Sequence, residues 1–399
     1  MTDEDFRAEV AQWMREHLTG EFERIRHRGG SGDEDADPAL RKKWEQELAA
    51  GRWTCIGWPE EHGGRNLSVA QQIIFHEEYA RAGGPGRMGH LGETLLGPTL
   101  IAFGTAAQKK QFLPGIVAGV EYWCQGYSEP AAGSDLANVQ MRARFDAANE
   151  EWVVDGQKVW TSLAHDSQWI FLLARCEPGS RGHSGLIFLL MPLDQPGVDV
   201  RPIRQITGTS EFNEVFFEGA RTPASNVVGA PGEGWKIAMA LLGFERGLSW
   251  IDQQMHFEHQ LQLVCDAARQ TGADRNPALR ARIGQAWLGL KVMHYHTLRT
   301  LPGSEDGTLS REAYINKYYW SHWHRDLGKL AVDVLGLEGD IRIDDFARTR
   351  LQQIFLFSRS DTIFAGTSEI QLNIISERAL GMPRESRPSR ASESTGTTS

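Results

Sequence analysis

Cysteine is scarce in this chain, and the cysteines that are present stand far apart. They are Cys55, Cys124, Cys176 and Cys265 among 399 residues, and no two of them have CxxC spacing. This distribution gives no sign of a disulfide framework and favours reduced, buried thiols. It therefore predicts a cytoplasmic protein.

A surplus of positive charge is also missing. The chain has 42 basic and 52 acidic residues, for a net charge of -10. This balance argues against nucleic acid as the main partner, because phosphate backbones are bound by basic patches. It still allows a local basic pocket for a phosphorylated small molecule.

Several familiar segments are absent as well. The N-terminal "MTDEDFRAEV" is acidic and has no apolar stretch, so we expect no secretory signal. No apolar run is long enough to span a bilayer. There is no P-loop and no GxGxxG after a strand, which argues against a Rossmann domain. The paired histidines lack the spacing or the further ligands of a metal site, so we expect no bound metal.

What is present is a core-forming chain, 41% hydrophobic, long enough for two or three domains. The first third has helical spacing, as at Leu40, Trp44 and Leu48. The segment "RGGSGDEDADP" interrupts it and predicts a loop. Further helices are expected at "AQQIIFHEEYARAGG", stopped by glycine, and at "GTAAQKKQFLPGIVAG".

The middle third has the pattern of short strands. A hairpin is expected in "NVQMRARFDAANEEWVVDGQKVWTS", followed by the strands "QWIFLLAR", "GLIFLLMPL", "VDVRPI" and "NEVFFEGA". The helical pattern then returns in one stretch from "GEGWKIAM" to "DAARQ", and again at 277–301 and 309–336. A last helix is expected over 368–378, with Thr367 as its N-cap.

These patterns divide the chain into an N-terminal helical domain at 1–121, a central β-domain at 122–230 and a C-terminal helical domain at 231–384. Residues 385–399 are rich in Ser, Thr and Pro and nearly free of apolar side chains. That tail is predicted to be disordered. The β-domain is expected to be a small barrel or a sandwich.

The densest chemical signal lies at residues 126–164. Small residues there let the backbone approach a flat ligand, and Trp160, Thr161 and Ser162 follow. An aromatic ring can cover a heteroaromatic cofactor, and a neighbouring hydroxyl can donate to a ring nitrogen. From the residues alone, a surface turn followed by a core tryptophan explains the stretch equally well.

The same stretch resembles the acyl-CoA dehydrogenase family over about residues 1–384. The shared motifs are "GWPEEHGG", "GTAAQKKQFLPGIVAG", "GYSEPAAGSD", "VDGQKVWTS", "GEGWKIAM" and "AGTSEIQLNIISERALG". The resemblance implies a helical domain, a β-barrel-like domain and a C-terminal four-helix bundle. It also implies FAD bound between the last two, an acyl-CoA substrate and an electron-transfer flavoprotein as electron acceptor.

The resemblance also implies roles for particular residues. Tyr127 and Ser128 match the pair at the flavin edge, and Ser134 matches a serine near the flavin and the CoA moiety. Trp160 matches the ring that packs on the flavin, and Ser162 the hydroxyl near its N5, with Thr161 between them. The matches near the cofactor's phosphates and adenosine are Gly366, Thr367 and Glu369.

The catalytic base is displaced in this sequence. The best-known family version has Glu where this chain has Ala365, which cannot accept a proton but keeps its backbone N–H. A branch of the family carries the base as a Glu immediately before Arg, which matches Glu245 and Arg246 here. The resemblance therefore implies that Glu245 is the base and that Arg246 orients the substrate. A small residue at 365 leaves room for a bulky acyl chain, while a helix-surface Glu beside a basic neighbour is the plainer interpretation.

The sequence departs from the family where one subunit serves the FAD of its neighbour. The Arg-x-x-Phe-Gly stretch is missing, Asp333 replaces a Gln, and Leu337 replaces a Gly. An aspartate repels a pyrophosphate. This resembles the catalytic subunit of actinobacterial heterotetramers of steroid side-chain type, and predicts a paralogous partner. A homo-oligomer that uses Arg275 or Arg280 instead is the alternative.

Two rival functions stay open from the sequence. A flavin oxidase or monooxygenase would keep the fold and react with oxygen. A non-catalytic subunit would only complete a partner's site, but Glu245 and the intact flavin-facing motifs argue against it.

Overall fold

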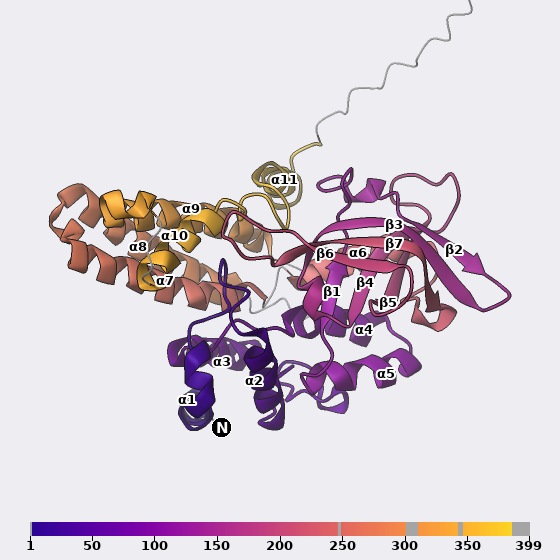
Figure 1. The fold of residues 1–399 in the computed structure, drawn as a ribbon, viewed down its shortest axis with the longest axis horizontal. Helices are drawn as coiled ribbons and strands as arrows, with labels where there is room; N and C mark the ends of the chain where they lie inside the picture. The colour runs from indigo at the N-terminus through magenta and orange to yellow at the C-terminus, as the bar shows by residue number, and fades with distance from the viewer. Residues whose placement is uncertain (1, 246–248, 301–309, 342–345, 385–399) are drawn as a thin grey trace, which may run out of the picture.

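The computed structural model describes residues 2–245, 249–300, 310–341 and 346–384. Three units are arranged around a common centre (Figure 1). The β-domain and the C-terminal helical bundle lie side by side, and the N-terminal helices lie below both. Along the chain, the described residues form helices, then strands, then helices, in the order expected from the sequence.

The N-terminal unit is helical, as predicted. Its α-helices are α1 (Asp3–His17), α2 (Pro38–Ala50), α3 (Val69–Ala82), α4 (Gly97–Phe103) and α5 (Ala106–Val117). Gly83 ends α3 in a left-handed conformation, with φ of 84°, which glycine adopts without strain. The predicted loop between Ile25 and Pro38 contains no helix or strand. Helix α4 had not been predicted.

The central unit is one curled sheet rather than two packed sheets. Its strands are β1 (Trp123–Gly126), β2 (Arg142–Asp146), β3 (Glu151–Ser162), β4 (Trp169–Arg175), β5 (Leu186–Pro192), β6 (Val198–Pro202) and β7 (Phe212–Pro223). They follow the order β1-β4-β2-β3-β7-β6, with β5 paired to β4. The β2–β3 hairpin and the four later strands lie where alternation placed them.

The C-terminal unit is a bundle of long helices. Its helices are α6 (Gly234–Glu245), α7 (Ser249–Thr271), α8 (Pro277–Thr300), α9 (Asn316–Leu335), α10 (Phe346–Phe357) and α11 (Ser368–Ile374). The stretch predicted as one helix from 232 contains two, α6 and α7. Residues 311–315 form a 3-10 turn, so α9 begins later than predicted. Helix α10 had not been predicted, although Leu351, Ile354 and Phe357 are buried at helical spacing.

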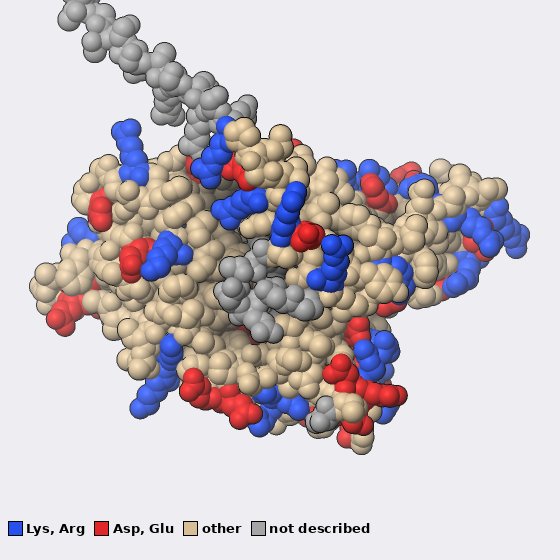
Figure 2. Space-filling view, turned by 180° about the vertical axis from the view of Figure 1, so that it is seen from behind, with Lys and Arg blue, Asp and Glu red and all other residues tan. Residues whose placement is uncertain are grey.

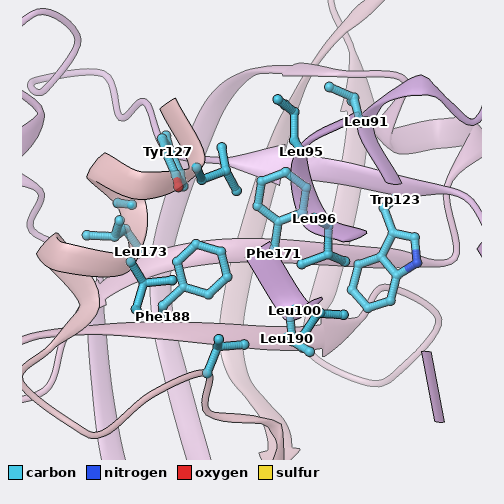
Figure 3. Packing of buried hydrophobic residues seen from close by; sticks show 14 of the residues in the cluster. Leu91, Leu95, Leu96, Leu100, Trp123, Tyr127, Phe171, Leu173, Phe188 and Leu190 are labelled. Atoms are coloured by element: carbon cyan, nitrogen blue, oxygen red, sulfur yellow. The ribbon is translucent and has the colours of Figure 1, made fainter. Parts of the chain in front are cut away.

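A large apolar cluster joins the N-terminal helices to the sheet. Leu91, Leu95, Leu96 and Leu100 pack against Trp123 and the inner residues of β4 and β5 (Figure 3). Its members are almost fully buried, so the sheet and the N-terminal helices form one rigid support. The four cysteines are free thiols. Cys55 and Cys124 are buried as expected, while Cys176 and Cys265 are only partly buried.

Candidate active site

Two of the predicted stretches lie side by side at the end of β1 and in β3. The Val159 N–H donates to the carbonyl of Ser128 over 3.0 Å. The ammonium of Lys158 donates to the carbonyl of Tyr127 at 3.1 Å and to Glu129 Oε1 at 2.8 Å. The segment after β1 is therefore fixed against the residues that immediately precede Trp160.

The Lys158–Glu129 ion pair is deeply buried. The Lys158 side chain is 0% exposed and that of Glu129 is 6% exposed. Burial lowers the pKa of Lys158 to about 8, and the Glu129 carboxylate opposes that shift. A buried pair of this kind is weak evidence for stability, but removing one partner leaves an uncompensated charge. Its role here is to hold the backbone of Tyr127 and Ser128 in place.

Trp160 occupies an irregular point of β3. The β3–β7 register shifts between Lys158 and Thr161, and Trp160 has a φ of 60°. Its ring is 58% exposed and meets Phe212 edge-on at 6.0 Å. The ring is therefore outside the core, and a bulge that re-aims a side chain is typical of functional sites. An uncovered indole fits a site that accepts the face of a flat cofactor.

The two hydroxyl neighbours of Trp160 differ in environment. Ser162 is half-buried at the end of the β3–β7 ladder, opposite Phe212. Thr161 is fully buried, and its Oγ1 has no hydrogen-bond partner among the described residues. Ser162 is thus the better placed of the two hydroxyls for a ligand that reaches Trp160.

Tyr127 and Ser134 also lie in contrasting surroundings. The Tyr127 ring points into the apolar cluster and packs edge-on against Phe171 and Phe188, at 6.2 Å and 6.4 Å (Figure 3). Only the backbone of Tyr127 can therefore face a flavin. Ser134 lies on an exposed loop, after Gly133, which has nothing near its Cα where a side chain would lie.

The third predicted stretch forms the turn between α10 and α11. Ala365 and Gly366 both have positive φ, of 49° and 91°. A Cβ on Gly366 would lie 2.6 Å from Gln371 Nε2, which itself donates to the Ala365 carbonyl at 3.0 Å. Thr367 caps α11, accepting from the Ile370 N–H at 3.3 Å, as predicted.

This turn belongs to the helical bundle, where α11 contacts α9. No hydrogen bond or ion pair between described residues links it to Ser128 or Ser162. The Glu369 side chain is exposed, and its own N–H and the Thr367 hydroxyl lower its pKa.

A cavity of about 240 Å³ lies at the end of the β3–β7 ladder, next to Ser162. Leu163 and Glu211 line it from the sheet, and the Leu163 N–H donates to the Glu211 carbonyl at 2.8 Å. Other parts of its wall come from the loop after Ile25 and from helices α2, α7 and α10. The polar side chains of this wall include His27, Glu34, Arg41, His259, Gln260 and Arg350. We call this cavity the polar chamber.

The chamber wall contains charged groups that are almost completely buried. Arg41 is 2% exposed, and its guanidinium donates to the carbonyls of Gly29, Glu34 and Gly86. Arg350 is 5% exposed and donates to the carbonyl of Ser31 at 2.8 Å. Burial lowers the pKa of both arginines, although nearby carboxylates oppose the shift.

Two histidines of the wall are stacked. The rings of His27 and His259 lie 3.7 Å apart at 11°. Burial, and then repulsion from neighbouring cations, lowers the pKa of both, that of His259 to about 4. Both rings are therefore neutral at physiological pH.

Models of a known protein family match all three units of the fold. Models of the N-terminal, middle and C-terminal domains of acyl-CoA dehydrogenases match residues 2–120, 124–220 and 232–380. The chain is 53% identical to the acyl-CoA dehydrogenase IpdE1 of Mycobacterium tuberculosis, over 96% of this chain and 99% of that protein. The chain belongs to the acyl-CoA dehydrogenase family.

Two solved structures are also similar to this acyl-CoA dehydrogenase. The Tcur3481-Tcur3483 steroid ACAD has a TM-score of 0.83 at 29% identity, covering 96% of this chain and 98% of that one. The ChsE4-ChsE5 complex from Mycobacterium tuberculosis has a TM-score of 0.81 at 27% identity, with the same coverage. Each of these structures is named after two proteins. In the described ranges, no helix of this dehydrogenase is long and apolar enough to cross a membrane.

The predicted catalytic base of this acyl-CoA dehydrogenase, Glu245, lies at the edge of the described residues. Glu245 is the last residue of α6, a helix that packs on β5 and α4. The side chain of Glu245 and the whole of Arg246 lie outside the described residues. The assignment of the base therefore stays a prediction.

Asp333 stands in the region that the family resemblance assigns to a neighbour's cofactor, and in this dehydrogenase it forms an ion pair. Asp333 accepts from Arg282 at 2.6 Å, with both side chains partly exposed. Its charge is therefore partly neutralised, which weakens the repulsion that we expected of an unpaired aspartate. Figure 2 shows Lys and Arg side chains at the far tip of the helical bundle. Arg275, in the turn between α7 and α8, and Arg280, near the start of α8, are exposed.

Sequence reasoning did not find the polar chamber of this dehydrogenase. Its members come from seven separate segments, and Glu34 and Glu211 are far apart in the chain. One signal was available in the loop "RGGSGDEDADP", where acidic residues lie close to Arg28 and Arg41. The sequence analysis interpreted this stretch only as a loop.

Proposed function

We propose that this acyl-CoA dehydrogenase uses FAD to convert an acyl-CoA thioester to its 2-enoyl-CoA. The observation that carries the proposal is the exposed Trp160 ring, raised on a bulge beside Ser128 and Ser162. The buried Lys158–Glu129 pair fixes this arrangement. Such a preorganised surface suits the flat, heteroaromatic face of a flavin.

The residues that would hold FAD follow from the same arrangement. Trp160 covers one face of the ring system, and the hydroxyls of Ser128 and Ser162 donate to its edge. Gly366 and Thr367, in the left-handed turn before α11, match the family residues near the cofactor's phosphates and would contact them. Bound FAD supplies the acceptor for a hydride that leaves the β carbon.

Glu245 removes the proton from the α carbon of the thioester. The carboxylate gains this proton, the β carbon loses a hydride, and the electron pair of the α C–H bond becomes the new C=C bond. The Ala365 N–H donates to the thioester oxygen and stabilises the negative charge that develops there. Burial of the bound thioester excludes water and brings the carboxylate pKa closer to the working pH.

The proposed electron acceptor of the enzyme is an electron-transfer flavoprotein. The test uses the purified holoenzyme with a saturated acyl-CoA and either an artificial electron acceptor or dissolved oxygen. We expect an enoyl-CoA that has lost two hydrogen atoms, with little oxygen uptake. Oxygen consumed in proportion to product would identify an oxidase. An enzyme with bound FAD and no product from any thioester would identify a non-catalytic subunit.

We further propose that a paralogous subunit completes the FAD site. Helix α8 presents an apolar face, with Leu288 58%, Val292 48% and Tyr295 66% exposed. Leu337, at a position where a glycine was expected, is 89% exposed. Exposed apolar patches of this kind mark protein interfaces. The two-chain complexes among the structural neighbours support the same assembly.

A further inference from the structure

The peptide unit between Tyr127 and Ser128 connects the interior of the β-domain to the candidate site. Its carbonyl oxygen accepts a hydrogen bond from the Lys158 ammonium at 3.1 Å. Because this peptide bond is trans, its N–H points away from its C=O. The N–H of Ser128 therefore points away from the buried ammonium.

The N–H of Ser128 is an unused donor. It has no acceptor in the part of the chain that the structure describes, whereas the Ser128 carbonyl accepts from the Val159 N–H at 3.0 Å. Ser128 is half-buried, and Val159 immediately precedes the exposed Trp160. Backbone N–H groups that are shielded from water almost always have a partner in native structures. A ligand that covers the Trp160 ring can supply that partner.

The Lys158 ammonium is held firmly at the Tyr127 carbonyl. Its side chain is 0% exposed, and the ammonium lies 2.8 Å from Glu129 Oε1. The Glu129 carboxylate is fixed in turn by the N–H groups of Gln140 and Met141, at 2.5 Å and 3.0 Å. The positive end of this ion pair thus contacts the peptide unit that carries the unused donor.

A cation at the carbonyl of a peptide strengthens the N–H of the same peptide as a donor, because hydrogen bonds in a chain polarise one another. Burial keeps water from screening this effect. A strengthened donor favours an acceptor that carries negative charge. A flavin gains electron density when it is reduced, so such a donor at its edge favours the reduced form over the oxidised form.

We propose that Lys158 is a positioning residue that raises the electron affinity of the bound flavin through the Tyr127–Ser128 peptide. Glu129 keeps the ammonium at the carbonyl, and the N–H of Ser128 carries the effect to the flavin edge. This role goes beyond fixing the backbone, because it distinguishes the two redox states of the cofactor. The inference deepens the proposed function and rests on it.

The test measures the midpoint potential of the flavin in the complex of this chain with its paralogue and FAD. The double variant Lys158→Met/Glu129→Gln removes both charges at nearly constant shape and leaves no unpaired buried ion. We expect the ratio of the affinities for reduced and oxidised flavin to fall at least about threefold, roughly 14 mV for a two-electron couple. A potential that is unchanged or higher overturns the inference.

A second variant covers the case in which the double variant does not fold. The amide of Lys158→Gln can still donate to the Tyr127 carbonyl and to Glu129, but it carries no charge. It should lower the potential in the same direction. The matched control is Arg221→Met/Glu151→Gln, which removes an ion pair of the same sheet whose side chains are 45% and 31% exposed. The control should keep the wild-type potential.

The affinity for FAD separates this role from a purely structural one. If the ion pair only holds the backbone in place, its removal weakens the binding of oxidised and reduced FAD to the same extent. The potential then stays at its wild-type value, although less FAD is retained. That result would contradict the role assigned to Lys158.

The same samples separate this inference from the proposed function. A lowered potential in the variants, with no enoyl-CoA formed by the wild type from any thioester, would reject the proposed function and keep the role of Lys158. Formation of enoyl-CoA with equal potentials in wild type and variants would do the reverse. A wild-type complex that takes up no FAD would reject both.

Discussion

At the scale of single residues, the assignment of the base is the sharpest claim. Replacing Glu245 with Gln keeps the size and hydrogen bonding of the side chain but removes the proton acceptor. We expect kcat to fall by about a thousandfold, the contribution typical of a general base. FAD content and thioester binding should stay near wild type. Glu258→Gln is the control, because Glu258 is an exposed carboxylate of α7.

A second substitution tests whether positions 365 and 245 are alternative positions for the catalytic base. The double variant Glu245→Gln/Ala365→Glu restores the carboxylate at the other position. Ala365 already has a positive φ of 49°, so Glu there adds little new backbone strain. Partial recovery of activity is expected. An active Glu245→Gln enzyme would remove the basis of the assignment.

Glu34 and Glu211, two carboxyl groups in the wall of the polar chamber, should make the stability of the fold depend on pH. The pKa of Glu211 is higher in the folded chain than in the unfolded one, so its contribution is complete below the unfolded value, near 4.5, and is lost as pH rises through the folded value. Glu211→Gln cannot titrate. Its melting temperature should therefore rise relative to wild type between pH 5 and pH 8.

The wild type and the variant share every other titratable group around Glu211. The wall also contains Arg41, Arg350, Glu34, His27, His90, His256 and His259, and none of them is changed by the substitution. Scanning calorimetry of both proteins at each pH is the measurement. A difference in melting temperature that stays constant with pH would show that the pKa of Glu211 is not raised in the folded chain.

A family motif was enough to propose some site residues but not others. Trp160 and Ser162 form one short motif, so a single stretch of sequence identifies them. Glu34 and Glu211 become a pair only through the loop contact at Asp35 and the β3–β7 register. No local pattern contains that information.

At the scale of elements, periodicity was a reliable guide where a helix or strand buries one face. Helix α3 and strand β7 lie where the pattern placed them, whereas β4 and β5 were recognised as continuous apolar runs and are buried on both faces. The single helix expected after 232 was wrong because apolar spacing continues through both α6 and α7. Helix α10 was missed, although its buried positions Leu351, Ile354 and Phe357 repeat every three residues.

The turn that carries Ala365 is anchored by a buried network. His324 bonds to Asp361 Oδ2 at 2.5 Å and to Gln260 Oε1 at 2.6 Å. Both His324 and Asp361 are 0% exposed. His324→Ala leaves a buried carboxylate without its partner, which costs about 3–5 kcal/mol.

Thermal unfolding checks this cost. We expect His324→Ala to melt at least roughly 5 °C below wild type. His322→Ala is the matched control on the same helix, because the partly exposed His322 bonds only to a backbone carbonyl of its own helix, that of Tyr318. Equal melting temperatures for all three proteins would show that the network does not anchor the turn.

At the scale of the whole molecule, the asymmetry between two surfaces is the main feature. The surface that we propose faces the flavin carries Ser128, Trp160 and Ser162 on a rigid sheet. The surface that serves a neighbour has lost its expected residues and carries the Asp333–Arg282 pair and the exposed Leu337 instead. One chain can therefore offer half of a cofactor site without being able to supply the other half.

This asymmetry predicts how much FAD the protein retains. Purified alone, the chain should contain well under one FAD per chain, because the pyrophosphate lacks its cationic partner. Co-expressed with its paralogue, the complex should contain about one FAD per pair of chains, measured by flavin absorbance against protein mass. Arg275→Gln/Arg280→Gln is the deciding variant, because these exposed arginines are the alternative pyrophosphate ligands. Full FAD content in the isolated wild type that is lost in this variant would establish a homo-oligomer, since the chain would then complete its neighbour's site itself.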